Sequence, residues 1–508
     1  MRTVGPTADI PEIVLDGRTL DHRQIAVAAE RGARVRLTTD SLERAGRSWE
    51  FAAGAASRRT LYGRSTGVGA NRTAPVTGDA AAHTLRLLRS HATSAGELRS
   101  AGRVRALLLV RLNQLAAGGS GVDPAILVAL AGMIDADALP FVRELGSIGT
   151  ADLSALATTA LALTGEVPTT RQLTGLIAFG TDGLAFLSSN AAVLGDAALA
   201  VASLAEAAQA AVVVAALTFH AAGGNAEAYS GAALRTTPFP GAVRVGIGLR
   251  WLLAADRSGT RRDVAGAPIP PARIQDPFAL RAVPQTHGPV LDAVTAAADV
   301  IDRLVNAPTE NPLTIADPEE PDGGVVAHHG GFHQAYLQMA LDSLSLAVAQ
   351  SGQLVLARLA TLVEPAFTGL APFLGDGTPG ASGVMVCEYV AASALASIRA
   401  AATPAGLQTV TLSRGVEEDA SFASLAAVQC LDIAQRYREL LAGELVAAVR
   451  ANRMGGARPV GGPLGEALAL CRPLSAEFAD RDLTDDLAVG ESLLPSLAAF
   501  LSAGVHYT

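Results

Sequence analysis

Long stretches rich in alanine and leucine restrict how this chain can fold more than any other feature. Half of the 508 residues are hydrophobic, but only 4% are aromatic. Small aliphatic residues at this density favour helices that are buried on several sides. The stretches expected to form long helices are 183–219, 284–306, 333–363, 383–401 and 421–450. The sequence therefore predicts a mostly α protein with a long-helix bundle as its core.

The N-terminal part of the chain has a different pattern. Residues 1–60 mix short helical and strand-like segments, and Gly-rich loops follow at residues 61–73 and 146–150. We therefore expect a smaller mixed α/β region over residues 1–185, which carries the loops, and a helix bundle over residues 186–508. So many apolar helix faces also favour association into an oligomer.

Charge and hydropathy exclude several kinds of partner. The net charge is −9, whereas a nucleic-acid surface needs clustered excess basic residues. The N-terminus has no charged-then-apolar signal segment. The apolar stretch 191–217 is interrupted by Asp196, Glu206 and Gln209, which favours a buried helix over a membrane span. We expect a cytoplasmic protein without a nucleic-acid or membrane partner.

Several chemistries can be excluded from residue types alone. The chain has no lysine, so a Schiff base of the kind used with pyridoxal phosphate cannot form. The cysteines are far apart and suggest a reducing compartment without disulfides; they are Cys387, Cys430 and Cys471. A histidine group lacks a supporting carboxylate pattern, so we expect no metal; its members are His328, His329 and His333.

The most informative motif is the turn at residues 146–153, with the sequence GSIGTADL. Asp152 is a natural N-cap for a helix that starts at Leu153. The motif resembles the signature of the histidine/phenylalanine/tyrosine ammonia-lyase and aminomutase family. There an Ala-Ser-Gly triplet precedes the Asp-Leu and cyclises into the electrophile methylidene-imidazolone (MIO). This sequence has only Ala151 at that place.

The resemblance leaves two interpretations of Ala151. Either the electrophile is absent, or Ala151 is a one-letter record of the cyclised triplet and the translated chain is two residues longer. Both flanks of position 151 match the family signature without further slippage. We therefore favour the second interpretation, in which MIO forms at position 151.

A second Gly-rich motif, LYGRSTGVG, covers residues 61–69. Its glycines predict a mobile lid that places the Tyr62 phenol over a site; the alternative is a tyrosine packed in a turn. The family resemblance implies that Tyr62 is the base that takes a β-proton from the substrate. Because a phenol titrates near 10, nearby dipoles or cations must hold it partly as phenolate.

Two segments match positions that set substrate selectivity in the family. Ser90 and His91 end a helix that begins near residue 80, and Glu417 and Glu418 open a match to the family's Gln-Glu-Asp. The resemblance implies that Ser90 and His91 bind the substrate and that Glu418 faces an imidazole ring. The alternatives are a structural histidine and an acidic cluster at a helix N-terminus.

The segment QDPFALR at residues 275–281 resembles the family's Gln-Asp-Pro-Tyr-Ser-Leu-Arg. The resemblance implies that Arg281 binds the substrate carboxylate through a bidentate fork. The alternative is an ordinary internal ion pair. Phe278 stands where the family has a catalytic Tyr near the electrophile.

Three further matches complete the predicted site. Asn311, in the segment ENPL, would help to hold the carboxylate, and Phe332, in HGGFH, would pack beside the electrophile; Gly331 replaces a common family Asn. Ser188 replaces the family Asn that touches the electrophile's oxygen. Asn190 lies two residues further on, so the sequence leaves open which side chain makes this contact.

The resemblance covers roughly residues 55–425 and implies a homotetramer whose active sites combine residues of several subunits. It implies an ammonia-lyase acting on a histidine-like or aromatic L-amino acid, with MIO and neither pyridoxal phosphate nor a metal. The first alternative is a 2,3-aminomutase that makes a β-amino acid with the same electrophile. The second is a non-catalytic homologue without MIO.

Overall fold

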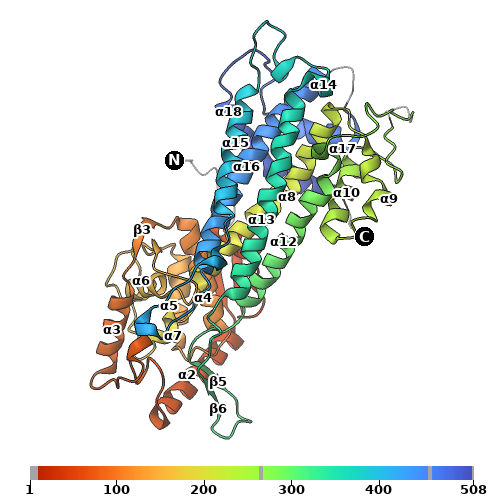
Figure 1. Cartoon of the computed structure of the whole chain (residues 1–508). Coiled ribbons are helices and arrows are strands. Elements are labelled where there is room, and N and C mark those ends of the chain that lie inside the picture. The colour runs from red at the N-terminus through yellow and green to blue at the C-terminus, as the bar shows by residue number, and fades with distance from the viewer. Residues whose placement is uncertain (1–9, 263–266, 456–459, 506–508) are drawn as a thin grey trace. The chain divides into compact units, whose positions relative to one another are not determined.

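Helices form most of the structure, a computed structural model that describes residues 10–262, 267–455 and 460–505 (Figure 1). The chain divides into two units. Unit 1 comprises Met1–Ala202, Ala297–Leu341 and Pro404–Val428, and unit 2 comprises Ser203–Ala296, Asp342–Thr403 and Gln429–Thr508. Neither unit is continuous in sequence. The division predicted at residues 185 and 186 differs from these units because the chain returns to unit 1 twice.

Unit 1 begins with the expected mixed α/β region. Strands β1 (Glu12–Leu15) and β2 (Arg34–Leu37) pair in parallel, and α1 (His22–Arg31) connects them. Asp21 caps α1 and forms a capping box with Gln24, which satisfies backbone groups at the helix start. The helix α2 that follows covers Thr39–Arg58.

The rest of unit 1 includes the buried helix α4 (Ala101–Ala116). The other elements of this part are η1 (Gly69–Asn71), α3 (Ala80–His91), β3 (Ala95–Leu98), α5 (Pro124–Asp135), β4 (Arg143–Leu145), α6 (Leu153–Leu163), α7 (Gly183–Leu187), β5 (Leu313–Ala316), β6 (Gly324–Ala327), η4 (Ala405–Leu407) and η5 (Ser413–Gly415). Strand β3 pairs with β4 and β5 pairs with β6, both antiparallel. Inside this core Arg111 of α4 pairs with Glu310 at 2.7 Å, and both side chains are fully buried.

The predicted long helices are confirmed, with one difference. They are α8 (Ala191–Ala221), α12 (Val283–Leu304), α13 (Ala335–Val363), α15 (Met385–Ala401) and α16 (Ala423–Met454). The helix predicted over 183–219 is interrupted, because residues 188–190 separate α7 from α8. Ser189 Oγ accepts a hydrogen bond from Ala191 N at 3.1 Å, which gives the first backbone N–H of α8 a partner.

Unit 2 contains the remaining elements around parts of these helices. They are η2 (Ala226–Tyr229), α9 (Gly231–Leu234), α10 (Pro240–Leu252), α11 (Phe278–Arg281), α14 (Pro365–Thr368), η3 (Pro372–Leu374), α17 (Gly462–Leu470) and α18 (Thr484–Gly504). A buried polar link joins three helices in this unit: Arg358 of α13 binds both carboxylate oxygens of Glu444 on α16, and Thr218 of α8 donates to the same carboxylate at 2.7 Å.

Four helical segments have the length and composition that a membrane span requires. They are Gly183–Ala221, Ala335–Val363, Met385–Leu407 and Thr484–Gly504. In the first segment 67% of the most apolar window is buried inside the protein. This burial agrees with the core helix predicted over 191–217.

The Arg358–Glu444 pair generates a stability prediction. Replacing Arg358 by Met leaves the fully buried Glu444 carboxylate without its cation, which should cost about 3–5 kcal/mol. The control is Arg303→Met, because Arg303 is exposed and pairs with Asp299 on its own helix. Urea unfolding followed by circular dichroism should show a clear loss for the first variant and little change for the second. Equal midpoints for both variants would contradict the prediction.

Candidate active site

The turn before α6 has an unusual backbone at position 151. Ala151 has a φ of 116°, which L-residues with a side chain rarely adopt. Its N–H donates to Asn190 Oδ1 at 3.1 Å, and the next N–H, of Asp152, donates to Ser189 O at 2.7 Å. The chain on either side of Ala151 is therefore held against the break between α7 and α8.

Asp152 occupies the N-cap position of α6, but its side chain does not cap that helix. The buried carboxylate instead accepts from Ser147 Oγ at 2.6 Å and from Val193 N, in the first turn of α8, at 2.9 Å. Burial raises the pKa of this carboxyl, and the two hydrogen bonds oppose that rise. Asp152 stands at the predicted N-cap position, but its carboxylate accepts from the first turn of α8 and not from α6.

The structure distinguishes the two candidates near residue 190. Asn190 Oδ1 accepts from Ala151 N, and its Nδ2 donates to Phe332 O at 2.6 Å. Ser188 Oγ instead accepts from Asn311 N at 2.9 Å. Asn190 is therefore the side chain that contacts position 151 and links it to Phe332.

The segment at Asn311 is held by a histidine. His329 N donates to Asn311 Oδ1 at 3.1 Å, and His329 Nε2 lies 2.6 Å from Glu310 O. Gly331 N donates to His329 Nδ1 at 2.8 Å. Both ring nitrogens thus have backbone partners. In the described part of the chain, no group of three or more His, Cys, Asp or Glu residues is arranged to hold a metal.

Tyr62 lies half-buried in its Gly-rich loop. Its hydroxyl oxygen accepts a hydrogen bond from Gly69 N at 2.7 Å. Burial raises the pKa of the phenol and Glu417 adds to this rise, whereas the Gly69 N–H and Arg72 oppose it. The net effect raises the pKa of Tyr62. The expectation that nearby groups hold the phenol partly as phenolate is therefore not met by the chain without a substrate. One dipole and one cation are present, but burial outweighs them.

The stretch from Leu412 to Ser424, termed here the 412–424 segment, contacts the Tyr62 loop. Its Ser413 Oγ accepts from Ala70 N at 3.0 Å. A Cβ placed on Gly69, which has a φ of 55°, would lie 2.7 Å from Ser413 Oγ. Only glycine therefore fits between the Tyr62 loop and this segment without displacement.

The same segment also contacts the turn that contains Ala151. Ser421 Oγ donates to Gly149 O at 2.8 Å, and Ser424 Oγ donates to Ser147 O at 2.9 Å. The 412–424 segment therefore holds both predicted catalytic loops within unit 1.

In the sequence, Glu418 lies between Ser413, which contacts the Tyr62 loop, and Ser421, which contacts the Ala151 turn. Its side chain is exposed. Its neighbour Asp419 lies 3.2 Å from His333 Nε2, on the segment that contains Phe332. The alternative of an acidic cluster at a helix N-terminus is wrong, because α16 begins at Ala423 and has no acidic residue in its first turn.

Ser90 and His91 end α3, as predicted. His91 Nδ1 lies 2.9 Å from Leu87 O and 3.0 Å from Ser90 Oγ. Ser90 Oγ also donates to Leu87 O at 3.0 Å. These contacts stay within the last turn of α3 and leave His91 Nε2 available to another group.

Phe278 and Arg281 lie in unit 2, on α11. The Arg281 guanidinium is 4.4 Å from the centre of the Phe278 ring, which is 67% exposed. With the Gln275 amide oxygen turned toward Arg281, that oxygen accepts from both terminal guanidinium nitrogens, at 2.5 and 3.0 Å. Among the described residues, the contacts of Arg281 are thus with neutral groups, which disfavours the internal ion pair.

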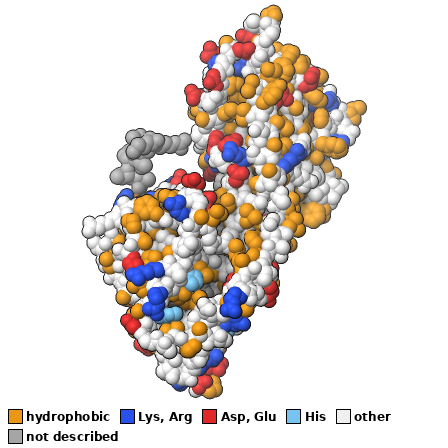
Figure 2. Space-filling model, turned by 60° about the vertical axis from the view of Figure 1, so that its left-hand side comes forward, with side chains coloured by type: hydrophobic (Ala, Val, Ile, Leu, Met, Phe, Trp, Pro, Cys, Tyr) orange, Lys and Arg blue, Asp and Glu red, His pale blue; other side chains and the backbone are white. Residues whose placement is uncertain are grey.

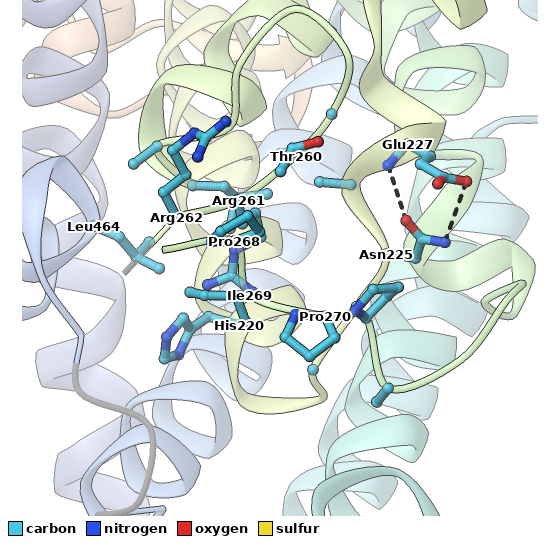
Figure 3. Close-up of a pocket in the computed structure, with 18 of the residues that line it drawn as sticks. His220, Asn225, Glu227, Thr260, Arg261, Arg262, Pro268, Ile269, Pro270 and Leu464 are labelled. Carbon is cyan, nitrogen blue, oxygen red and sulfur yellow. Dashed lines mark hydrogen bonds between the residues drawn. The ribbon is translucent and has the colours of Figure 1, made fainter. Parts of the chain in front are cut away.

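Unit 2 also contains a cavity of about 760 Å³. Its labelled lining residues in Figure 3 are His220, Asn225, Glu227, Thr260, Arg261, Arg262, Pro268, Ile269, Pro270 and Leu464. None of them is a predicted site residue. Asn225 connects its wall to the 275–281 segment, because Asn225 N donates to Asp276 Oδ2 at 2.6 Å. Asn225 Nδ2 also donates to O of the preceding residue, Ile274, at 3.1 Å.

Some of the residues that organise the site were not predicted. Ser413, Ser421 and Ser424 carry no motif, because a serine in a loop has no sequence pattern that reveals its distant partner. Arg111 was also missed, although its buried partner Glu310 lies in the matched ENPL motif. Together these residues place a phenol, an amide and a strained backbone turn in one unit.

The chain is similar to known proteins over most of its length. The family model described as "Aromatic amino acid lyase" matches residues 20–472. A histidine ammonia-lyase of Treponema denticola is 30% identical over 94% of this chain and 96% of its own length. One from Gloeobacter violaceus is 34% identical over 86% and 87%. The crystal structure of a tyrosine aminomutase from Streptomyces globisporus is 27% identical, with a TM-score of 0.87 over 97% of this chain and 98% of that one. The chain therefore belongs to the aromatic amino acid lyase family of carbon–nitrogen lyases.

Proposed function

We propose that the protein is an ammonia-lyase that eliminates the α-amino group of a histidine-like or aromatic L-amino acid. The products are an α,β-unsaturated acid and ammonia. One observation carries the proposal: the 412–424 segment holds the loop of Tyr62 and the turn of Ala151 in the same unit. A base and an electrophile must act on the same substrate, so their loops need a common support.

We infer that Ala151 stands for a cyclised Ala-Ser-Gly. The family uses MIO, and the residues at position 151 fit such a group. The φ of 116° is unusual for a simple alanine, and Asn190 and the neighbouring Ser189 carbonyl already hold both sides of the position. The group would supply the electrophile for the substrate, a task that a chain without lysine cannot give to a Schiff base.

Tyr62 is proposed to take the β-proton of the substrate. Burial raises the pKa of its phenol in the chain alone, and a positive charge on the bound substrate would oppose this rise. A substrate ammonium near the phenol would favour the phenolate, as Arg72 does. The released proton is weakly acidic, so fixed dipoles and proximity must lower most of the barrier.

Arg281 and Asn311 are proposed to hold the substrate carboxylate, with Phe278 and Phe332 packing beside the reaction centre. The Arg281 fork is supported by Gln275 and by the Phe278 ring, and both are uncharged. A carboxylate would therefore be its neutralising partner. The guanidinium geometry suits two parallel hydrogen bonds.

The proposed homotetramer is supported by exposed apolar side chains. Tyr336 and Met339 on α13 and Tyr389 on α15 are 84%, 62% and 69% exposed. Figure 2 shows that apolar side chains are numerous on one face of the protein, between charged ones. Exposed apolar side chains that lie together mark surfaces that associate, and Tyr336 and Met339 are about one turn apart on α13. Association would allow one site to combine residues of several subunits.

The histidine-like ring is proposed from His91 and Glu418, with Ser90 orienting His91. An imidazole can donate to a carboxylate and accept from a second ring nitrogen. The runner-up function is a 2,3-aminomutase. The similarity to a tyrosine aminomutase over nearly the whole chain favours it as the second candidate.

Incubation of the purified protein with L-histidine, L-phenylalanine and L-tyrosine tests the proposed reaction. We expect release of ammonia together with an α,β-unsaturated acid, and the highest kcat/KM for a substrate with a nitrogen-containing ring. Chromatography that instead reveals a β-amino acid would select the aminomutase. Absence of either product from all three substrates would contradict the proposal in this form.

The Tyr62→Phe variant tests the proposed base. Loss of one hydroxyl should reduce kcat about 10²–10⁴-fold, the usual contribution of general base catalysis. Tyr437→Phe is the matched control, because Tyr437 of α16 loses the same atom, contacts Ser351 in unit 2 and has no assigned place in the site. If kcat of Tyr62→Phe stays within tenfold of the unaltered protein, Tyr62 is not the base.

Intact mass spectrometry tests the identity of position 151. We expect a mass greater than that of the 508-residue chain by one Gly and one Ser less two water molecules. This difference corresponds to a cyclised Ala-Ser-Gly in place of a single Ala. A mass equal to the printed sequence would instead identify a non-catalytic homologue.

A further inference from the structure

Gly69 is the point at which Tyr62 and the 412–424 segment meet. Its N–H donates to the Tyr62 hydroxyl oxygen at 2.7 Å. A Cβ on Gly69 would lie 3.3 Å from Glu417 Oε1. The phenol oxygen and the Glu417 carboxylate therefore lie against the same small residue, with no side chain of residue 69 to separate them.

Glu417 is also a departure from the family motif. The matching Gln-Glu-Asp has a neutral amide at the first position, whereas this chain has a carboxylate there. The bridge between Leu412 and Glu417 fixes the backbone of the segment, because Leu412 N donates to Glu417 O at 2.9 Å. The chain thus has an added negative charge on a fixed turn beside Tyr62.

Arg72 provides an opposite charge on the loop of Tyr62 itself. Its N–H donates to Gly69 O at 3.1 Å, so the residue follows Gly69 in a tight turn. Glu417 disfavours the phenolate of Tyr62 and Arg72 favours it. The two charges therefore act in opposite directions on the same hydroxyl.

The other charged groups near the Tyr62 loop are either paired in the interior or exposed to solvent. Arg64 is buried and pairs with Asp182 of the α7 N-terminus at 2.8 Å, so the charges of this pair offset each other. The remaining ones are exposed side chains at the start of the loop and along the 412–424 segment; they are Arg59, Arg414, Glu418 and Asp419, the last of which pairs with His333.

We propose that Glu417 and Arg72 are opposed positioning residues that set the pH range in which Tyr62 can accept a proton. The proposal rests on the proposed role of Tyr62 as base. Neither residue needs to touch the substrate. Glu417 moves the acidic limb of the activity profile to higher pH, and Arg72 moves it to lower pH.

Three variants, each of which neutralises one charged side chain, test the proposal. They are Glu417→Gln, Arg72→Gln and the control Glu50→Gln. Glu50 is an exposed carboxylate on α2 in the same unit, so the control changes the net charge by the same amount and sign as Glu417→Gln. Each variant is titrated spectrophotometrically for tyrosinate, with and without Tyr62→Phe. The difference isolates Tyr62 among the six tyrosines without requiring activity.

We expect Glu417→Gln to lower the midpoint of the Tyr62 tyrosinate titration by about 0.5 pH unit. This is the effect of one charge across a few ångströms of screened solvent. Arg72→Gln should raise it, and Glu50→Gln should leave it unchanged. Added salt should shrink both shifts. Shifts absent from both variants, or of the same sign, would overturn the proposal.

The profile of kcat/KM against pH separates this inference from the proposed function. If the acidic limb moves with the Tyr62 midpoint in both variants, the inference and the base role are supported together. If the titration shifts but the limb does not, Glu417 and Arg72 still control the Tyr62 phenol, and the base role of Tyr62 is overturned.

Discussion

Side-chain hydrogen bonds from one irregular segment to two distant loops are the interaction on which the candidate site depends. Ser413 holds the loop of Tyr62, whereas Ser421 and Ser424 hold the turn before α6. The three contacts join parts of the chain that are more than 250 residues apart in sequence. Without them, each loop would pay its ordering entropy separately and the two would have no fixed relation.

Buried polar groups give this arrangement a rigid base. Asp152 is buried and links Ser147 to the first turn of α8. The buried pair of Arg111 and Glu310 links α4 to the segment that precedes Asn311. Buried charges of this kind are costly unless every partner is in place. Their main effect is therefore to select one arrangement of the chain, and their contribution to stability is smaller. A site that must hold a strained turn at position 151 benefits from such definition.

The fold was largely predictable, and its local exceptions were not. The long helices followed from composition and periodicity, because helix formation and burial are local properties of a sequence. The break between α7 and α8 escaped this reasoning, since Ser188 and Asn190 use their side chains on distant partners. The sequence also did not indicate that the pKa of Tyr62 is raised, because burial depends on the packed structure and not on the motif.

The sequence by itself determined the helical class, the absence of lysine chemistry and the residue types at each matched motif. These follow from composition and from short-range patterns. Tertiary structure alone decided that Asn190 rather than Ser188 contacts position 151, and that Glu417 and the Tyr62 phenol lie against the same glycine, Gly69. The physical reason is that hydrogen bonds and Coulomb interactions depend on distance in space, which a linear sequence leaves open until the chain has packed.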